Sequence, residues 1–174
     1  NSNQNVVFGQ SNDISNNTNS IISGLTNTLL NDNQSFFIGE NIKSNTTISS
    51  SIQGYDISSN SNYYSNFSGK KHVIKDSSNV IITGNEHSIN KTTSILVSGY
   101  KHDISNNTIQ SIISGYNNKE SNGENNATFG STNIINDSSN NIISGFNNTS
   151  NKTEKTFIIG NANISKKNVN SILS

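Results

Sequence analysis

The stretch at residues 19–24 reads NSIISG, and its repetition along the chain decides the fold. Similar stretches are QSFFIG at 34–39, SILVSG at 94–99, QSIISG at 110–115, NNIISG at 140–145 and KTFIIG at 155–160. Each ends in a glycine of one regular series: Gly9, Gly24, Gly39, Gly54, Gly69, Gly84, Gly99, Gly115, Gly130, Gly145 and Gly160. Successive glycines are fifteen residues apart, except for sixteen between Gly99 and Gly115, and only Gly123 lies outside the series.

A repeat of this length predicts the architecture of the chain. It is shorter than the repeats of helical solenoids, and no apolar pattern with a period of 3.6 residues accompanies it. Fifteen residues suffice for one coil of two short strands and their turns. We therefore predict one all-β domain over residues 1–174, a parallel β-solenoid of about twelve coils that is roughly 55 Å long at normal strand spacing.

The apolar residues before each glycine predict how the strand is buried. The second residue before the glycine is almost always apolar: Val7, Ile22, Phe37, Ile52, Phe67, Ile82, Val97, Ile113, Thr128, Ile143 and Ile158. The third residue before it is often apolar too: Val6, Ile21, Phe36, Ser51, Asn66, Ile81, Leu96, Ile112, Ala127, Ile142 and Phe157. Because neighbouring residues of a strand face opposite sides, one set fills the coil and the other needs a second surface. We expect the chain to associate along this second set; the alternative is a monomeric solenoid with one exposed apolar side.

Composition excludes several classes of function. Only 29% of the 174 residues are hydrophobic and the formal net charge is zero, so nothing favours nucleic acid or an anionic membrane surface as a partner. There is no stretch of about 20 apolar residues, which a membrane span needs. Cysteine and proline are absent. The acidic residues are scattered and no serine has the setting of a nucleophile, so we expect no catalytic residue, no metal and no cofactor.

The repeated NSIISG-like motif resembles the NSVAIG repeat in the YadA-like heads of trimeric autotransporter adhesins. This resemblance covers essentially the whole chain and implies a left-handed parallel β-roll assembled as a homotrimer. It further implies a virulence-associated head on the surface of a Gram-negative bacterium, anchored in the outer membrane by a C-terminal region absent from this chain. Such a head would bind a host cell-surface glycoprotein or matrix protein. The composition rich in Asn, Ser and Ile indicates an AT-rich bacterial genome, such as a fusobacterial one, and the chain thereby resembles fusobacterial adhesins of this type that bind CEACAM receptors. The chain departs from the family where Ala or Ser is usual, three and five residues after the glycine.

Aromatic and basic residues that depart from the repeat are the candidate receptor-binding residues. They are Tyr55, Tyr63, Tyr64, Lys70, Lys71, Tyr100 and Tyr116. Tyrosine is favoured in interfaces, although a residue directly after the glycine can simply cover the edge of the coil. The tract at 117–126 (NNKESNGENN) is a second candidate, because its extra glycine predicts a looser, projecting turn.

The three histidines, His72, His87 and His102, all lie three residues after a coil glycine. We therefore expect them to stack roughly 5 Å apart. A metal ladder or a pH-sensitive strip is one interpretation, but other coils have asparagine here, which favours a purely structural Asn/His ladder. Two further functions stay open as alternatives: ice binding by a monomeric solenoid, and a polysaccharide-acting β-helix enzyme.

Overall fold

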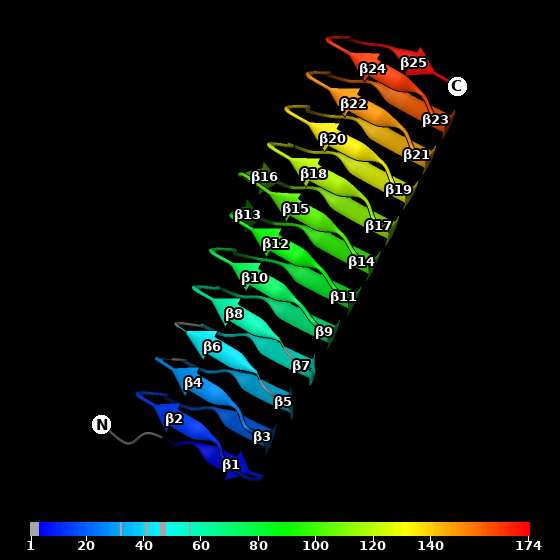
Figure 1. Cartoon of the computed structure of the whole chain (residues 1–174). Helices are drawn as coiled ribbons and strands as arrows, with labels where there is room; N and C mark the ends of the chain where they lie inside the picture. The colour runs from blue at the N-terminus through cyan, green and yellow to red at the C-terminus, as the bar shows by residue number, and fades with distance from the viewer. Residues whose placement is uncertain (1–3, 32, 41, 46–47, 56) are drawn as a thin grey trace.

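The chain winds into a straight stack of parallel β coils with the two termini at opposite ends (Figure 1). The computed structural model describes residues 4–31, 33–40, 42–45, 48–55 and 57–174, and within these ranges it contains strands and no helix. Each coil contributes one strand to each of two long parallel sheets. The predicted parallel β-solenoid is thereby confirmed, with about eleven turns rather than twelve, since the last strand begins a turn that has no partner in the second sheet.

Sheet A is the twelve-stranded sheet, and its strands are formed by the repeated motif. Its strands, in spatial and chain order, are β1 (Val6–Phe8), β3 (Ile21–Leu25), β5 (Phe36–Glu40), β7 (Ser51–Tyr55), β9 (Asn66–Lys70), β11 (Ile81–Asn85), β14 (Leu96–Tyr100), β17 (Ile112–Tyr116), β19 (Ala127–Ser131), β21 (Ile142–Phe146), β23 (Phe157–Asn161) and β25 (Ile172–Leu173). The strands pair in the register of the repeat, so that Ile82 lies beside Phe67 and Gly84 beside Gly69.

Sheet B has eleven strands and forms the opposite wall of the coil. They are β2 (Asp13–Ser15), β4 (Thr28–Leu30), β6 (Lys43–Asn45), β8 (Ser58–Asn60), β10 (Val73–Lys75), β12 (Ser88–Asn90), β15 (Asp103–Ser105), β18 (Lys119–Ser121), β20 (Ile134–Asn136), β22 (Thr149–Asn151) and β24 (Ile164–Lys166). A third, narrow side is held by single bridges such as Ile48 to Tyr63, and by the pair β13 (Thr92–Thr93) and β16 (Thr108–Ile109).

Three tight corners per coil explain why the chain is so rich in asparagine. In the coil that follows Gly24, the backbone is left-handed at Thr26 (φ 59°), Asn31 (φ 60°) and Gln34 (φ 53°). The same three positions recur in later coils, and asparagine, aspartate and serine occupy many of them. Asn and Asp tolerate this conformation better than other residues with a side chain, so a polar composition here reflects corners and not disorder.

The coil glycines form a column in which each backbone packs on the next. At Gly69 the backbone has φ 128°, and a Cβ atom there would lie 1.5 Å from the carbonyl oxygen of Gly84. Both the conformation and the close approach exclude a side chain. The fifteen-residue glycine period is therefore the spacing at which successive coils come into contact.

The burial of sheet A follows the predicted alternation. Ile22 and Phe67, two residues before their glycines, are fully buried, whereas Ile21 and Ile81, three residues before, are about half exposed. The interior contains two separate apolar clusters. The larger comprises Ile22, Leu29, Phe37, Ile42, Ile52, Ile57, Phe67, Ile74, Val80, Ile82, Ile89, Ile95, Val97, Ile104 and Ile113, and the smaller comprises Ile135, Ile143 and Ile158.

The tract at 117–126 is part of the regular coil, so the predicted projecting turn is wrong. Strand β18 pairs with both β15 and β20, and Glu124 bridges Ile109 and Ser139. Gly123 is buried inside the coil, where it makes room for the side chain of Glu120. The one extra residue of the long coil lies elsewhere, at the corner where Asn106 and Asn107 are both left-handed (φ 56° and 64°).

Candidate binding surface

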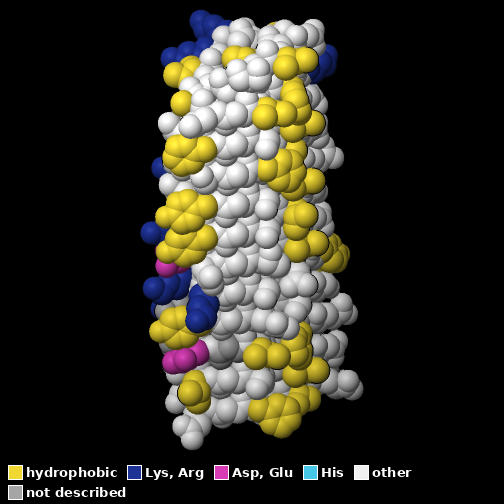
Figure 2. Space-filling model, turned by 90° about the vertical axis from the view of Figure 1, so that its right-hand side faces the viewer, with side chains coloured by type: hydrophobic (Ala, Val, Ile, Leu, Met, Phe, Trp, Pro, Cys, Tyr) yellow, Lys and Arg dark blue, Asp and Glu magenta, His cyan; other side chains and the backbone are white. Residues whose placement is uncertain are grey.

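The residues that directly follow the coil glycines form an outward-facing column along one edge of sheet A, here called the aromatic column. Its members are Leu25, Glu40, Tyr55, Lys70, Asn85, Tyr100, Tyr116, Ser131, Phe146 and Asn161. Figure 2 shows it as the left-hand band of hydrophobic side chains, with charged groups between them. Tyr55 and Lys70 are direct neighbours in the sheet register, and both side chains are exposed.

A preorganised cluster lies in the middle of this column. The rings of Tyr100 and Tyr116 stack with their centroids 5.4 Å apart, and the Tyr100 hydroxyl donates to a Glu86 carboxylate oxygen at 3.0 Å. Lys101 Nζ lies 3.6 Å from the same carboxylate oxygen and 5.4 Å from the centroid of the Tyr100 ring. Tyr100 and Glu86 raise the pKa of Lys101 above its ordinary value. Tyr100 and Tyr116 are among the candidate residues that the sequence indicates. Glu86 and Lys101 are not, because they lie at corners of adjacent coils and meet only when the coils stack.

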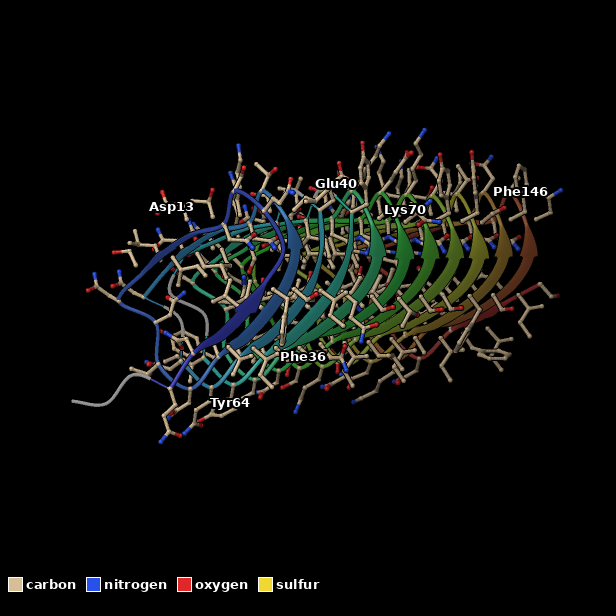
Figure 3. All side chains as sticks on the ribbon, turned by 90° about the horizontal axis from the view of Figure 1, so that it is seen from below. Asp13, Phe36, Glu40, Tyr64, Lys70 and Phe146 are labelled. Carbon is tan, nitrogen blue, oxygen red and sulfur yellow. The ribbon has the colours of Figure 1, made fainter. Side chains whose placement is uncertain are left out.

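Tyr63 and Tyr64 lie at a different edge of sheet A from Tyr55 and Lys70. They precede β9, whereas Lys70 ends it, so the length of the strand separates the two groups. Figure 3 shows Tyr64 on one side of the rod and Glu40, Lys70 and Phe146 together on the other. The structure therefore divides the predicted receptor-binding residues into two surfaces. Lys71 occupies the left-handed corner after Lys70 (φ 54°) and belongs with the aromatic column.

A second apolar band, here called the apolar ridge, follows the other edge of sheet A. It consists of the exposed residues Val6, Ile21, Phe36, Ile81, Leu96, Ile112, Ile142 and Phe157, and β25 continues it with Ile172. Figure 2 shows the ridge as the right-hand yellow band, separated from the aromatic column by a polar strip. Ser51 and Asn66 interrupt the ridge beside Tyr55. The ridge is thus an extended exposed apolar surface, as the sequence predicts.

The outer faces of the two sheets differ in charge. In sheet A, the residues one and three positions before each glycine include no Lys, Arg, Asp or Glu. The outer positions of sheet B, in contrast, carry Asp13, Lys43, Lys75, Asp103, Lys119 and Lys166. The ridge side of sheet A can therefore be buried without the cost of desolvating ions, whereas the sheet B face and the aromatic column, which carries Glu40 and Lys70, cannot.

The histidines form the predicted stack inside the coil. The ring centroids of His72 and His87 are 5.1 Å apart, and those of His87 and His102 are 5.0 Å apart, with the rings almost parallel. His87 Nε2 lies 3.2 Å from the Thr83 carbonyl oxygen, and the His102 backbone N–H donates to His87 Nδ1 at 3.2 Å. The neutral ring with hydrogen on Nε2 satisfies both contacts.

Asparagine at the same position makes the same pair of hydrogen bonds. Asn118 Nδ2 donates to the Ser114 carbonyl oxygen at 3.1 Å, and its Oδ1 accepts the backbone N–H of Asn133 at 2.9 Å. The Asn/His ladder is therefore confirmed. Burial lowers the pKa of all three histidines, that of His87 to about 4. No group of three or more His, Asp or Glu side chains within the described ranges is arranged to hold a metal ion.

One buried carboxyl group interrupts the apolar interior. Glu120 lies between Ile104 and Ile135 in sheet B, at a position where an aliphatic side chain faces the core. Its Oε1 accepts hydrogen bonds from Ser111 Oγ and Asn126 Nδ2, both at 2.8 Å, while Oε2 is buried without a partner. Burial raises the pKa of Glu120. This coil separates the two apolar clusters.

The fold defines the chain as a parallel β-solenoid protein, and comparisons with known proteins add no family. No family model matches the sequence, and no curated protein matches it. Among solved structures, a UDP-N-acetylglucosamine acyltransferase from Campylobacter jejuni aligns at 10% identity and a TM-score of 0.20, over 88% of this chain and 65% of that chain. So low a score carries no argument about fold or function. Within the described residues, no helix is long and apolar enough to span a membrane.

Proposed function

We propose that this chain is the head of a trimeric surface adhesin that acts by binding host ligands. In this proposal the solenoid is left-handed and three copies pack through sheet A. A C-terminal region outside this chain would anchor the protein in the outer membrane of a Gram-negative bacterium. The host ligand would be a cell-surface glycoprotein, such as a CEACAM receptor, or a matrix protein. The resemblance of the repeated motif to that of YadA-like heads supports the handedness, the trimer, the membrane anchor and the host ligand in this proposal.

The apolar ridge is the observation that carries the proposal. Ile81 and Ile142 are 50% and 47% exposed in the single chain, and their equivalents continue along most of the rod. Contiguous apolar patches of this extent are rare on soluble monomers. Because the outward positions on the ridge side of sheet A, one and three residues before each glycine, lack charge, a like surface of another copy can cover the ridge, and a closed symmetric oligomer would bury every copy equally.

Sedimentation equilibrium of the purified chain tests the assembly. We expect a trimer, and we expect Ile81→Asp combined with Ile112→Asp to give folded monomers, because two charges would then enter the interface. Ile164→Asp is the matched control, since Ile164 is an exposed isoleucine of sheet B, off the ridge. A wild-type chain that remains monomeric at micromolar concentration would refute the assembly and favour a monomeric solenoid.

The exposed tyrosines support the binding role. They are held on a rigid sheet, so little conformational entropy is lost when a partner covers them. We expect the immobilised chain to capture host surface proteins. Tyr100→Ala with Tyr116→Ala should weaken that capture, as should Tyr63→Ala with Tyr64→Ala, without lowering the melting temperature. If neither double variant changes the capture, the receptor site lies elsewhere on the rod.

A further inference from the structure

Tyr63 and Tyr64 form an isolated aromatic corner on the narrow third side of the solenoid. Tyr63 is bridged to Ile48 in the preceding coil and to Ser78 in the following one. The exposed fractions of Tyr63 and Tyr64 are 40% and 65%. The following coils have Ser78 and Thr93 in line with Tyr63, so no aromatic residue continues this column beyond it in those coils.

The coil backbone holds these two residues at and beside a corner. Tyr64 has φ 50°, at a corner where neighbouring coils have serine or asparagine. The same left-handed corner recurs in the other coils, for example at Ser49 (φ 53°) and Asn79 (φ 54°), so the fold itself places the Tyr64 side chain at an exposed corner. Hydrogen bonds from the Tyr63 N–H to the Ser77 carbonyl oxygen (3.2 Å) and from the Tyr64 N–H to the Ile48 carbonyl oxygen (2.9 Å) hold both residues in the ladder. The rings are thus carried on a rigid support.

A hollow opens beside Tyr63 across two successive coils. It has a volume of about 260 Å³ and is lined by Ser61, Tyr63, Asp76, Ser77 and Ser78. Ser77 is the buried residue of this lining, and its hydroxyl donates to the Lys75 carbonyl oxygen at 2.7 Å. The Asp76 carboxylate is exposed and takes part in neither of the ion pairs found in the described part of the chain.

We propose that this hollow binds one hexose unit of a glycan. A sugar ring has an apolar C–H face that packs on an aromatic ring, and hydroxyl groups that donate strong hydrogen bonds to a carboxylate. Tyr63 supplies the first and Asp76 the second, with the Ser78 hydroxyl nearby. Asp76 disfavours phosphate or an acidic sugar by charge repulsion, and Tyr63 is the one apolar lining residue, too little for an aliphatic peptide side chain. The ligand is therefore a neutral hexose, and its place on a host glycoprotein rests on the proposed function.

Saturation-transfer difference NMR tests the site with methyl β-galactoside, methyl β-glucoside, methyl α-mannoside and N-acetylglucosamine, each at about 10 mM, because so small a site binds in the millimolar range. We expect transfer to the ring C–H protons of at least one sugar. Tyr63→Ala should weaken binding about tenfold or more, Tyr63→Phe should retain it, and Asp76→Asn should weaken it severalfold. Ile164→Ala is the control, because Ile164 is an exposed apolar residue of sheet B outside the hollow and outside the aromatic column. No transfer from any of these sugars, or equal transfer with Tyr63→Ala, overturns the proposal.

Binding to host cells is measured separately with the same variants. A chain that binds cells but none of the sugars refutes the hexose site and leaves the adhesin proposal intact. A chain that binds a sugar through Tyr63 but no host cell or matrix protein refutes the adhesin proposal and leaves the hexose site intact.

Discussion

Acidification from pH 7 to about pH 4 should destabilise this protein through its histidine stack. In the folded state, His87 Nδ1 accepts a backbone N–H and the ring stacks between His72 and His102. A proton on Nδ1 would replace that acceptor with a second donor and put like charges about 5 Å apart. Burial, followed by the charges of the neighbouring histidines, lowers the pKa of His87 from 6.5 to about 4, while the backbone carbonyl of Thr83 opposes this shift.

The sign and size of the effect follow from proton linkage. Above pH 6.5 the ring is neutral in both states and contributes nothing to the pH dependence. As the pH falls from 6.5 to about 4, His87 binds a proton in the unfolded chain but not in the folded chain, so the free energy of unfolding decreases across this window. At about 1.4 kcal/mol per pH unit, His87 alone accounts for a loss of about 3 kcal/mol. His72 and His102, whose pKa values are also lowered, add to it.

Urea unfolding followed by circular dichroism at several pH values between 7 and 4 measures this loss. The control is the triple variant His72→Asn, His87→Asn, His102→Asn, because asparagine in other coils makes the same two hydrogen bonds. We expect the variant to fold and to lose much less stability than the wild type on acidification. Glu120, whose raised pKa acts in the opposite direction, cancels in the comparison. Parallel stability curves for the two proteins would refute the reasoning, and failure of the triple variant to fold at pH 7 would refute the equivalence of Asn and His.

Three further perturbations test the packing. Ile22→Asp should abolish folding, since an unpaired charge would enter the core at a cost above about 4 kcal/mol. Ile21→Asp, on the apolar ridge, should weaken the oligomer but leave the chain folded, as judged by circular dichroism. Equal loss of β structure in both variants would contradict the assigned faces. Gly84→Ala should lower the melting temperature strongly, because its Cβ would lie 1.8 Å from the Gly99 carbonyl oxygen, and a normal melting curve would show that the coils can separate there. Glu120→Gln should raise the free energy of unfolding at pH 7, because burial raises the pKa of this carboxyl group and disfavours its charged form, and the gain should shrink towards pH 4. A loss of stability at pH 7 would mean that the charged form is stabilised.

The repeated motif made most of the fold predictable from the sequence. A glycine every fifteen residues and apolar residues two positions before it specify a solenoid and the inward face of sheet A, because stacked coils must repeat their contacts. The histidine column was predictable for the same reason, since Asn118 and His102 occupy one position in successive coils. The prediction of a projecting turn at 117–126 is wrong because Gly123 lacks a side chain in order to leave room for Glu120, and not in order to loosen the backbone. Nothing in the local sequence distinguishes those two uses of glycine.

By itself, the sequence determined the period, the two sheets and the exposed apolar ridge, because these depend on spacing along one chain. Only the tertiary structure decided which residues meet between coils. It placed Tyr63 and Tyr55 at different edges of sheet A, joined Glu86 to Tyr100, and gave Glu120 its partners Ser111 and Asn126. The physical reason is that each contact joins residues across a coil corner or across the interior, where side-chain length and direction decide and the repeat period carries no information.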